Sequence, residues 1–187
     1  MKKKIIPLLV LLLMACAQET KSADDTKKVE IDKNWNTFTQ ANYEIKYPSN
    51  WELDQSGKMG TSFIVFSPLE NENDKFKENI NLVIQDLTGK NINLDKYTKI
   101  SEEQIKTMIT NSKILESEQV KNDLTEYHKV IYTGDQGIYH LTFEQYYWVM
   151  NEKVYIITFT SEVTTFKNYR GVGEKIMNSF VIQNAKK

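Results

Sequence analysis

Hydrophobic and polar residues alternate with a period of two along much of the chain after residue 42. In the first such segment, Tyr43, Ile45 and Tyr47 alternate with polar residues and Pro48 ends the run, which is the pattern of a half-buried strand. Similar runs separated by turn residues predict further strands at 62–67, 79–87, 114–120, 124–132, 138–150 and 154–161. The last four form an almost continuous meander, which we expect at the centre of a sheet.

Residues 94–111 change to the helical period. Ser101 followed by Gln104 is the signature of a capping box, so we expect the helix to begin there, with an earlier turn over 94–100 extending it. Ile105, Met108 and Ile109 then fall at i, i+3 and i+4, a single apolar stripe suited to packing on a sheet.

A second helix is predicted over 165–179, where apolar residues again recur at helical spacing. Gly171 and Gly173 weaken its middle, each by about 1 kcal/mol relative to alanine, and mark either a kink or a close approach to the sheet. The order of strands, helix, strands and helix predicts an α+β fold, a six- to seven-stranded antiparallel sheet with helices packed on its faces. Residues 35–183 are enough for one domain with one core, followed by a tail at 184–187.

The N-terminus has the pattern of a secretory signal. Lys2, Lys3 and Lys4 precede an apolar run from Ile5 to Ala15, and small residues close it. The run is too short for a membrane-spanning helix, which needs about 20 apolar residues.

The segment Leu13-Met14-Ala15-Cys16 resembles the bacterial lipobox. The resemblance implies cleavage between Ala15 and Cys16, which removes residues 1–15, and transfer of a diacylglycerol to the Cys16 sulfur. Cys16 is the only cysteine, and a lone unpaired thiol would be unusual in an exported protein. The alternative is an ordinary cleaved signal with a chance cysteine. Residues 16–34 are then the lipidated cysteine and a disordered polar tether, and two or three acyl chains suffice for stable anchoring.

Charge excludes some partners. Removing residues 1–15 deletes three lysines and no acids, so the 24 basic and 25 acidic residues become 21 and 25, a net charge of −4. Electrostatic binding to nucleic acid is therefore not expected. We expect the membrane to be reached through the lipid alone, with the water-soluble domain on the periplasmic or surface face of an envelope membrane.

Several short motifs are similar to those of the PsbP-like superfamily. They are Tyr43 with Tyr47-Pro48 and Trp51, Glu78-Asn79-Ile80-Asn81-Leu82, Tyr155-Ile156-Ile157-Thr158, and Ser179-Phe180. The resemblance covers residues 38–182 and implies an α/β/α sandwich. It also implies a binding or accessory subunit rather than an enzyme, because members of this superfamily mostly act in that way.

The candidate ligating residues are few. His128 and His140 are the only histidines, whereas a metal site needs three or four converging ligands. Glu144 shares a face of one strand with His140, but four residues separate them by about 13 Å. A two-histidine site with His128 on a neighbouring strand stays open, although structural or surface histidines are favoured. We expect no metal and no cofactor.

An aromatic run at Tyr146, Tyr147 and Trp148 is the other candidate. Alternation sends Tyr147 to one face of the sheet and the other two to the opposite face. Tyr146, Trp148 and His140 could bind a ligand or form a protein-binding hot spot. We favour the alternative that a helix covers the two aromatics, because a sheet covered on both sides needs large apolar residues on both faces.

No serine-nucleophile, phosphate-loop or dinucleotide motif is present, and the carboxylates single out no catalytic pair. We therefore expect a membrane-anchored envelope lipoprotein whose non-catalytic domain binds a protein partner. The alternative is a carrier of a small apolar or lipid ligand held between sheet and helix, which would need a pocket of about 300 Å³ or more. An enzyme is the third reading, and it would need buried carboxylates converging with His140.

Overall fold

The computed structural model describes residues 34–121 and 125–183. The predicted signal peptide, the lipidation site at Cys16, the tether up to residue 33 and the tail at 184–187 lie outside the described residues.

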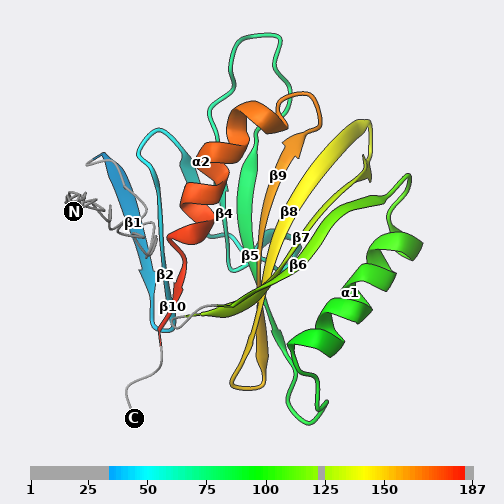
Figure 1. Cartoon of the computed structure of the whole chain (residues 1–187). Coiled ribbons are helices and arrows are strands. Elements are labelled where there is room, and N and C mark those ends of the chain that lie inside the picture. The colour runs from blue at the N-terminus through cyan, green and yellow to red at the C-terminus, as the bar shows by residue number, and fades with distance from the viewer. Residues whose placement is uncertain (1–33, 122–124, 184–187) are drawn as a thin grey trace, which may run out of the picture.

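A seven-stranded antiparallel sheet forms the body of the domain (Figure 1). Its strands in spatial order are β3 (Glu52–Asp54), β4 (Phe63–Phe66), β5 (Asn79–Asp86), β9 (Lys153–Glu162), β8 (Tyr139–Met150), β7 (Glu126–Gln136) and β6 (Lys113–Lys121). The predicted meander is β6 to β9. The expectation that this meander forms the centre of the sheet is wrong in part. The meander runs inward from the edge strand β6, and of its four strands only β9 lies at the centre.

A second, three-stranded sheet was not predicted. It has the order β1 (Trp35–Gln40), β2 (Tyr43–Pro48) and β10 (Val181–Ile182). Strand β10 pairs Val181 with Glu44, so the end of the described chain lies beside its beginning (Figure 1). The expected burial of Tyr43, Ile45 and Tyr47 is confirmed, but this strand belongs to the small sheet.

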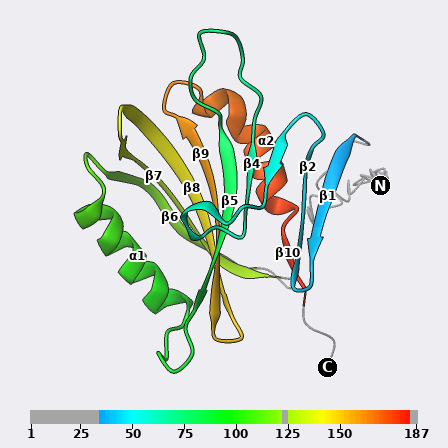
Figure 2. The same cartoon turned by 180° about the vertical axis from the view of Figure 1, so that it is seen from behind.

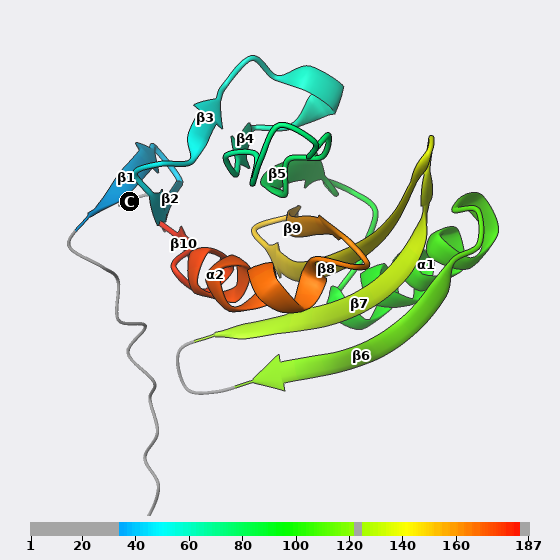
Figure 3. The same ribbon diagram turned by 90° about the horizontal axis from the view of Figure 1, so that it is seen from above.

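Two α-helices cover opposite faces of the large sheet, as predicted. They are α1 (Leu94–Met108) and α2 (Phe166–Asn178), and a short 3₁₀ helix, η1 (Lys58–Gly60), precedes β4. Figure 3 shows α1 on one side of the sheet, with α2 and the small sheet on the other. The expected split of the aromatic run is also confirmed, because Tyr146 packs in the core under α2 and Tyr147 in the core under α1.

Helix α1 begins earlier than the capping box at Ser101 indicated. The side-chain oxygen of Asn93 caps it, accepting a hydrogen bond from the Lys96 amide at 2.9 Å. Ser101 lies inside the helix, with its hydroxyl 2.8 Å from that of Tyr147. The earlier turn expected over 94–100 is therefore confirmed as part of the helix. Only the capping role given to Ser101 was wrong, because its side chain contacts Tyr147 on the sheet. Met108 leaves the predicted apolar stripe, being 77% exposed.

Helix α2 approaches the sheet closely at one of its two glycines, which confirms one of the two interpretations that the sequence allowed. A Cβ on Gly173 would lie 2.9 Å from Cδ1 of Phe159 on the central strand, whereas Gly171 has nothing within 4 Å of that position. Ile176 and Met177 are buried on the same side. The helix can therefore lie flat on β9 only where residue 173 has no side chain.

Candidate functional site

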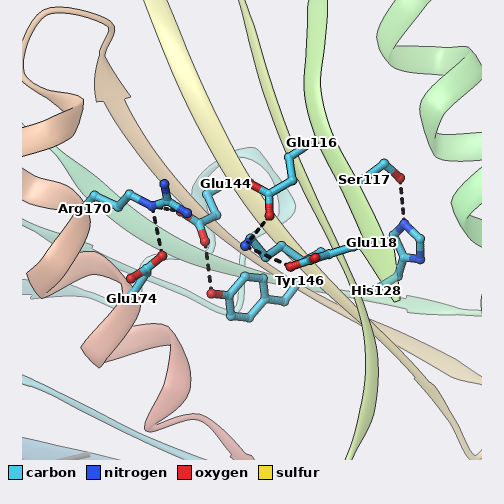
Figure 4. Close-up of polar contacts among 9 residues, drawn as sticks. Glu116, Ser117, Glu118, His128, Glu144, Tyr146, Arg170 and Glu174 are labelled. Carbon is cyan, nitrogen blue, oxygen red and sulfur yellow. Dashed lines mark hydrogen bonds and ion pairs between the residues drawn. The ribbon is translucent and has the colours of Figure 1, made fainter. Parts of the chain in front are cut away.

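A cluster of charged side chains lies beside α2 on the face of the sheet that this helix covers (Figure 4). Strand register brings Glu118, Lys129 and Tyr146 into one row across β6, β7 and β8. Lys129 Nζ lies 2.6 Å from Glu116 Oε1 and 3.1 Å from Glu118 Oε1. The hydrogen bond from Lys129 lowers the pKa of the Glu116 carboxyl. These three groups are fully paired with one another.

Glu144 is the fully buried member of the cluster. Tyr146 Oη donates a hydrogen bond to its Oε1 at 3.0 Å, and Arg170 Nε lies 3.6 Å from its Oε2. Burial raises the pKa of Glu144, the charge of Glu174 raises it further, and Arg170 opposes both. Among the residues the structure describes, Oε2 has no hydrogen-bond partner. In the sequence, Glu144 was noted only as a neighbour of His140 on one strand face, and no spacing indicated that it would be buried.

Glu78 is a second buried carboxylate, at the N-terminus of α2. The hydroxyls of Thr165, Ser67 and Ser161 donate to it at 2.7, 3.3 and 3.5 Å. Burial is the main cause that raises its pKa. Thr165 is also the N-cap residue of α2. Glu78 and Glu144 thus hold this helix to the sheet at two points, which is a structural role.

The two histidines do not form a site together. His140 is exposed and its Nδ1 pairs with Asp135 Oδ1. His128 lies opposite Tyr147, seven residues further along β8, which corresponds to about 23 Å. The two-histidine site that the sequence left open is therefore wrong. In the described ranges, no group of three or more His, Cys, Asp or Glu residues is placed to hold a metal ion.

His128 instead contacts Ser117, whose Oγ lies 2.8 Å from His128 Nε2 (Figure 4). Ser117 donates in turn to Glu102 on α1. The hydroxyl therefore lies between the histidine and the carboxylate, whereas a nucleophilic triad needs the histidine in the middle. This chain of contacts links β6 and β7 to α1 without activating the serine.

Tyr146 and Trp148 are buried in the core beneath α2, as the favoured reading of the aromatic run expected. Trp148 packs against Phe180 with ring centroids 5.4 Å apart. Its edge also lines a pocket of about 510 Å³ at the end of the sheet, beside Asn93 and Met150. Of the three candidate binding residues, Trp148 alone lines a described pocket, and His140 lies apart from it.

A second and larger concave surface, which we call the trough, lies on the other face of the sheet, next to α1. It has a volume of about 660 Å³. Helix α1 contacts β6, β7 and β8, and Figure 2 shows neither α-helix in front of β4 and β5. The lining residues are Met59, Thr61, Ile64, Phe66, Phe76, Asn79, Asn81, Val83, Gln85, Tyr132, Gln136, Gly137, Tyr139, Leu141, Phe143, Gln145, Ile156, Thr158 and Thr160.

Register explains how these residues meet. One cross-strand row, running from β4 to β7, consists of Phe66, Asn79, Thr160, Phe143 and Tyr132. The neighbouring row, from β4 to β8, consists of Ile64, Asn81, Thr158 and Gln145. Amides and hydroxyls thus occupy the middle of the trough, with apolar and aromatic residues toward its sides. None of the lining residues is Asp, Glu, Lys, Arg or His.

Comparison with known proteins identifies the fold. No protein-family model matches the chain, and no curated protein matches its sequence. The PsbP protein CyanoP from Synechocystis sp. PCC 6803 shares the fold with a TM-score of 0.59 at 14% identity, over 80% of this chain and 93% of that one.

Two further structures agree. PA94 from Pseudomonas aeruginosa, a protein of unknown function, has a TM-score of 0.58 at 11% identity, over 81% of this chain and 99% of that one. LpqN from Mycobacterium tuberculosis, which is involved in cell envelope biogenesis, has a TM-score of 0.58 at 11% identity, over 76% and 83%. The predicted PsbP-like fold is therefore confirmed, and none of the three is named for a catalytic activity. At these identities the likeness concerns the fold alone.

The helices in the described part of the chain are all too short or too polar to span a membrane.

Proposed function

We propose that the chain is a bacterial envelope lipoprotein, held at a membrane by a lipid on Cys16, whose PsbP-like domain is a non-catalytic binding module. The trough carries the binding assignment. Its volume of about 660 Å³ lies within the range of ligand sites, about 300–1,000 Å³. Charged residues make up 26% of the chain, yet none lines this surface. A surface so different from the rest of the molecule is suited to a ligand.

Binding accounts for the trough better than catalysis does. General acid–base and nucleophilic chemistry near neutral pH are typically carried by His, Asp, Glu, Lys or Cys side chains, and none of these lines the trough. The lining offers amides, apolar groups and hydroxyls, and burial raises the pKa of the Tyr132 hydroxyl above its usual value. The buried carboxylates Glu78 and Glu144 lie on the opposite face of the sheet, where hydroxyls, Tyr146 and Arg170 surround them. Neither can reach a ligand in the trough.

The sequence supports the anchor. Leu13-Met14-Ala15-Cys16 has the lipobox pattern, the run before it is too short to span a membrane, and Cys16 is the only cysteine. LpqN, a fold neighbour, is involved in cell envelope biogenesis, which suits an envelope location. The polar segment from Ala17 to Lys33 would let the domain work at a distance from the lipid.

A carrier of an apolar ligand is the alternative, and the size of the trough favours it. The position and chemistry of the trough oppose it. The trough lies on a part of the sheet that neither α-helix closes over, and an apolar ligand would bury the Asn81 amide, which has no partner among the described residues, at about 1–3 kcal/mol for an unsatisfied group. A polar ligand or a protein partner avoids this cost.

Replacing Cys16 tests the anchor. In cells fed an alkyne analogue of palmitate, the parent protein should take up the label and fractionate with membranes, whereas Cys16→Ala should do neither. A Cys16→Ala protein that is labelled and fractionates like the parent would overturn the lipoprotein assignment.

A photocrosslinker tests the binding surface. Met59, an exposed residue that lines the trough, is replaced by p-benzoylphenylalanine, and Glu103 on the exposed side of α1 receives the same residue as a control. The proposal expects one defined adduct in intact cells from position 59 and none from position 103. It further expects Gln136→Lys, which places a charge at the exposed rim, to suppress that adduct. Equal crosslinking from both positions, or none from position 59, would contradict it.

A further inference from the structure

We infer that the ligand of the trough is a neutral oligosaccharide. This inference rests on the proposed function, because it takes the trough to be a binding surface and names the chemical class that would occupy it. A sugar ring carries hydroxyls that both donate and accept hydrogen bonds around its edge, and apolar C–H groups on its faces. The two rows of the trough offer a partner for each.

Asn81, Thr158 and Gln145 provide the polar row on three adjacent strands. The Gln145 amide donates to Thr158 Oγ1 at 3.1 Å, and Tyr147 Oη donates to Gln145 Oε1, so the amide is held in one orientation. It keeps one N–H and one lone pair for a ligand. Within the described residues, the Asn81 side chain makes no hydrogen bond, so its two donors and its acceptor remain available.

Amides suit this role because a carboxamide presents a donor and an acceptor side by side. Neighbouring hydroxyls of a sugar can engage both at once. The amides of Asn79 and Asn81 project from the same face of β5, two residues and about 7 Å apart, so the site has a repeat along the strand as well as across the sheet. This arrangement suits a chain of sugar units better than a single small molecule.

Aromatic rings provide the apolar complement. Phe143 is half-buried and stacks on Tyr132, with ring centroids 4.8 Å apart at 19°. Phe76 packs against Tyr139 at 5.1 Å, and Tyr139 Oη donates to the Lys75 carbonyl at 3.1 Å. That hydrogen bond fixes the loop between β4 and β5 to β8. Phe143, Phe76 and Tyr139 all remain partly exposed, so they can cover the C–H faces of sugar rings.

The uncharged lining selects among ligand classes. Nucleic acids and anionic glycans are recognised through Lys and Arg, which the trough lacks. Protein-binding hot spots are enriched in Trp and Arg as well as Tyr, and neither Trp nor Arg lines this surface. A neutral polar ligand with apolar faces matches both the residues that are present and those that are missing.

The test uses the full-length lipidated protein in lipid nanodiscs, which avoids sugar-based detergents. Calorimetry with maltohexaose, cellohexaose, mannohexaose and chitohexaose should detect at least one ligand with a Kd below about 1 mM. Hexagalacturonate, which carries carboxylates, should not bind. Because no ion pair contributes, the affinity should be insensitive to salt.

Three variants locate the binding. Asn81→Leu and Gln136→Leu should each weaken the affinity by about tenfold or more, which corresponds to about 1.4 kcal/mol. Gln136 is exposed, so its substitution guards against a loss that merely reports misfolding. Gln104→Leu, an exposed amide on α1, should leave the affinity unchanged.

Failures of the two proposals are distinguishable. If none of the neutral hexasaccharides binds but the photocrosslinker at position 59 still captures one protein, the sugar inference is overturned and the binding function stands. If there is neither sugar binding nor an adduct, both are overturned. Sugar binding that survives Asn81→Leu and Gln136→Leu unchanged would place the site elsewhere and overturn the inference.

Discussion

Arg170, the only arginine in the chain, lies with its Nε 3.6 Å from Oε2 of the fully buried Glu144. Arginine suits such a position because its guanidinium is weakly hydrated and always charged. The same nitrogen donates to Glu174 one helical turn away, at 2.9 Å. One cation of α2 thus serves a buried acid on the sheet and an acid on its own helix, which joins α2 to β8.

Arg170→Gln should destabilise the domain in a pH-dependent way. Removing the cation takes the nearby positive charge from the buried Glu144 carboxyl, and we expect a loss of about 1–3 kcal/mol in the free energy of unfolding at pH 8. The loss stays below that for a fully buried pair because Arg170 is itself partly exposed. Burial raises the pKa of Glu144. The loss should therefore shrink as the pH falls through that raised pKa and the carboxyl becomes neutral. Urea unfolding at pH 8 and pH 5 measures the difference.

The double variant with Glu144→Gln is the control for this pair. It removes the buried charge together with its partner, so it should recover part of the stability that Arg170→Gln loses at pH 8. An equal loss at both pH values, or no recovery in the double variant, would show that Arg170 acts through packing on Phe166 instead of through Glu144.

Glu78→Gln should stabilise the domain at pH 8, whereas Arg170→Gln should destabilise it. Three hydroxyls donate hydrogen bonds to Glu78, and burial raises its pKa, so the folded state binds its proton more tightly than the unfolded state does. The stabilising contribution of this group is present at acid pH and is lost as the pH rises through the raised pKa. Glu78→Gln should therefore increase the free energy of unfolding at pH 8, by about 1 kcal/mol, and change it less at pH 5. Thermal unfolding across this range, with the exposed Glu72→Gln as the control, tests the sign; greater destabilisation at pH 8 than at pH 5 would refute it.

Much of the fold follows from local pattern. The alternation of Tyr43, Ile45 and Tyr47 correctly predicted a strand with one buried face, and helical spacing located α2 to within a residue at each end. The small sheet could not be predicted in this way. Its third strand has only two residues, Val181 and Ile182, which is too short for a period, and its pairing with β2 joins segments more than a hundred residues apart.

The trough was missed for a related reason. In β5, the buried residues Ile80 and Leu82 alternate with Asn79 and Asn81, and such an alternation by itself predicts only that the two amides face away from the core. In β9, Thr158 and Thr160 interrupt a largely apolar strand, and this was the available signal: a central strand covered on both faces would carry apolar residues there. Only the register across β5, β9 and β8 shows that these polar residues are neighbours.

The true start of α1 is open to a direct test. Asn93→Ala removes the side-chain acceptor for the Lys96 amide and should cost about 1 kcal/mol in the free energy of unfolding. Asn93→Ser keeps a capping oxygen and should stay within a few tenths of the parent. If the two variants are equally stable in urea unfolding, Asn93 does not cap the helix.

Gly173→Ala and Gly171→Ala form the sharpest matched pair in the molecule. Alanine is favoured over glycine in a helix by about 1 kcal/mol, and Gly171, with open space around it, should show that gain as a higher urea midpoint. At Gly173 a Cβ would meet the Phe159 ring at 2.9 Å. Because Phe159 is fully buried on the central strand, the ring cannot move aside without disturbing the core.

Overpacking of this kind costs about 1–3 kcal/mol, which outweighs the gain in helix propensity. Gly173→Ala should therefore unfold at a lower urea concentration than the parent, and Gly171→Ala at a higher one. Phe159→Leu supplies the internal check, since a smaller side chain at position 159 should relieve part of the cost of alanine at 173 and make the two substitutions non-additive. Stabilisation by both glycine substitutions would mean that α2 does not rest on β9 at Gly173.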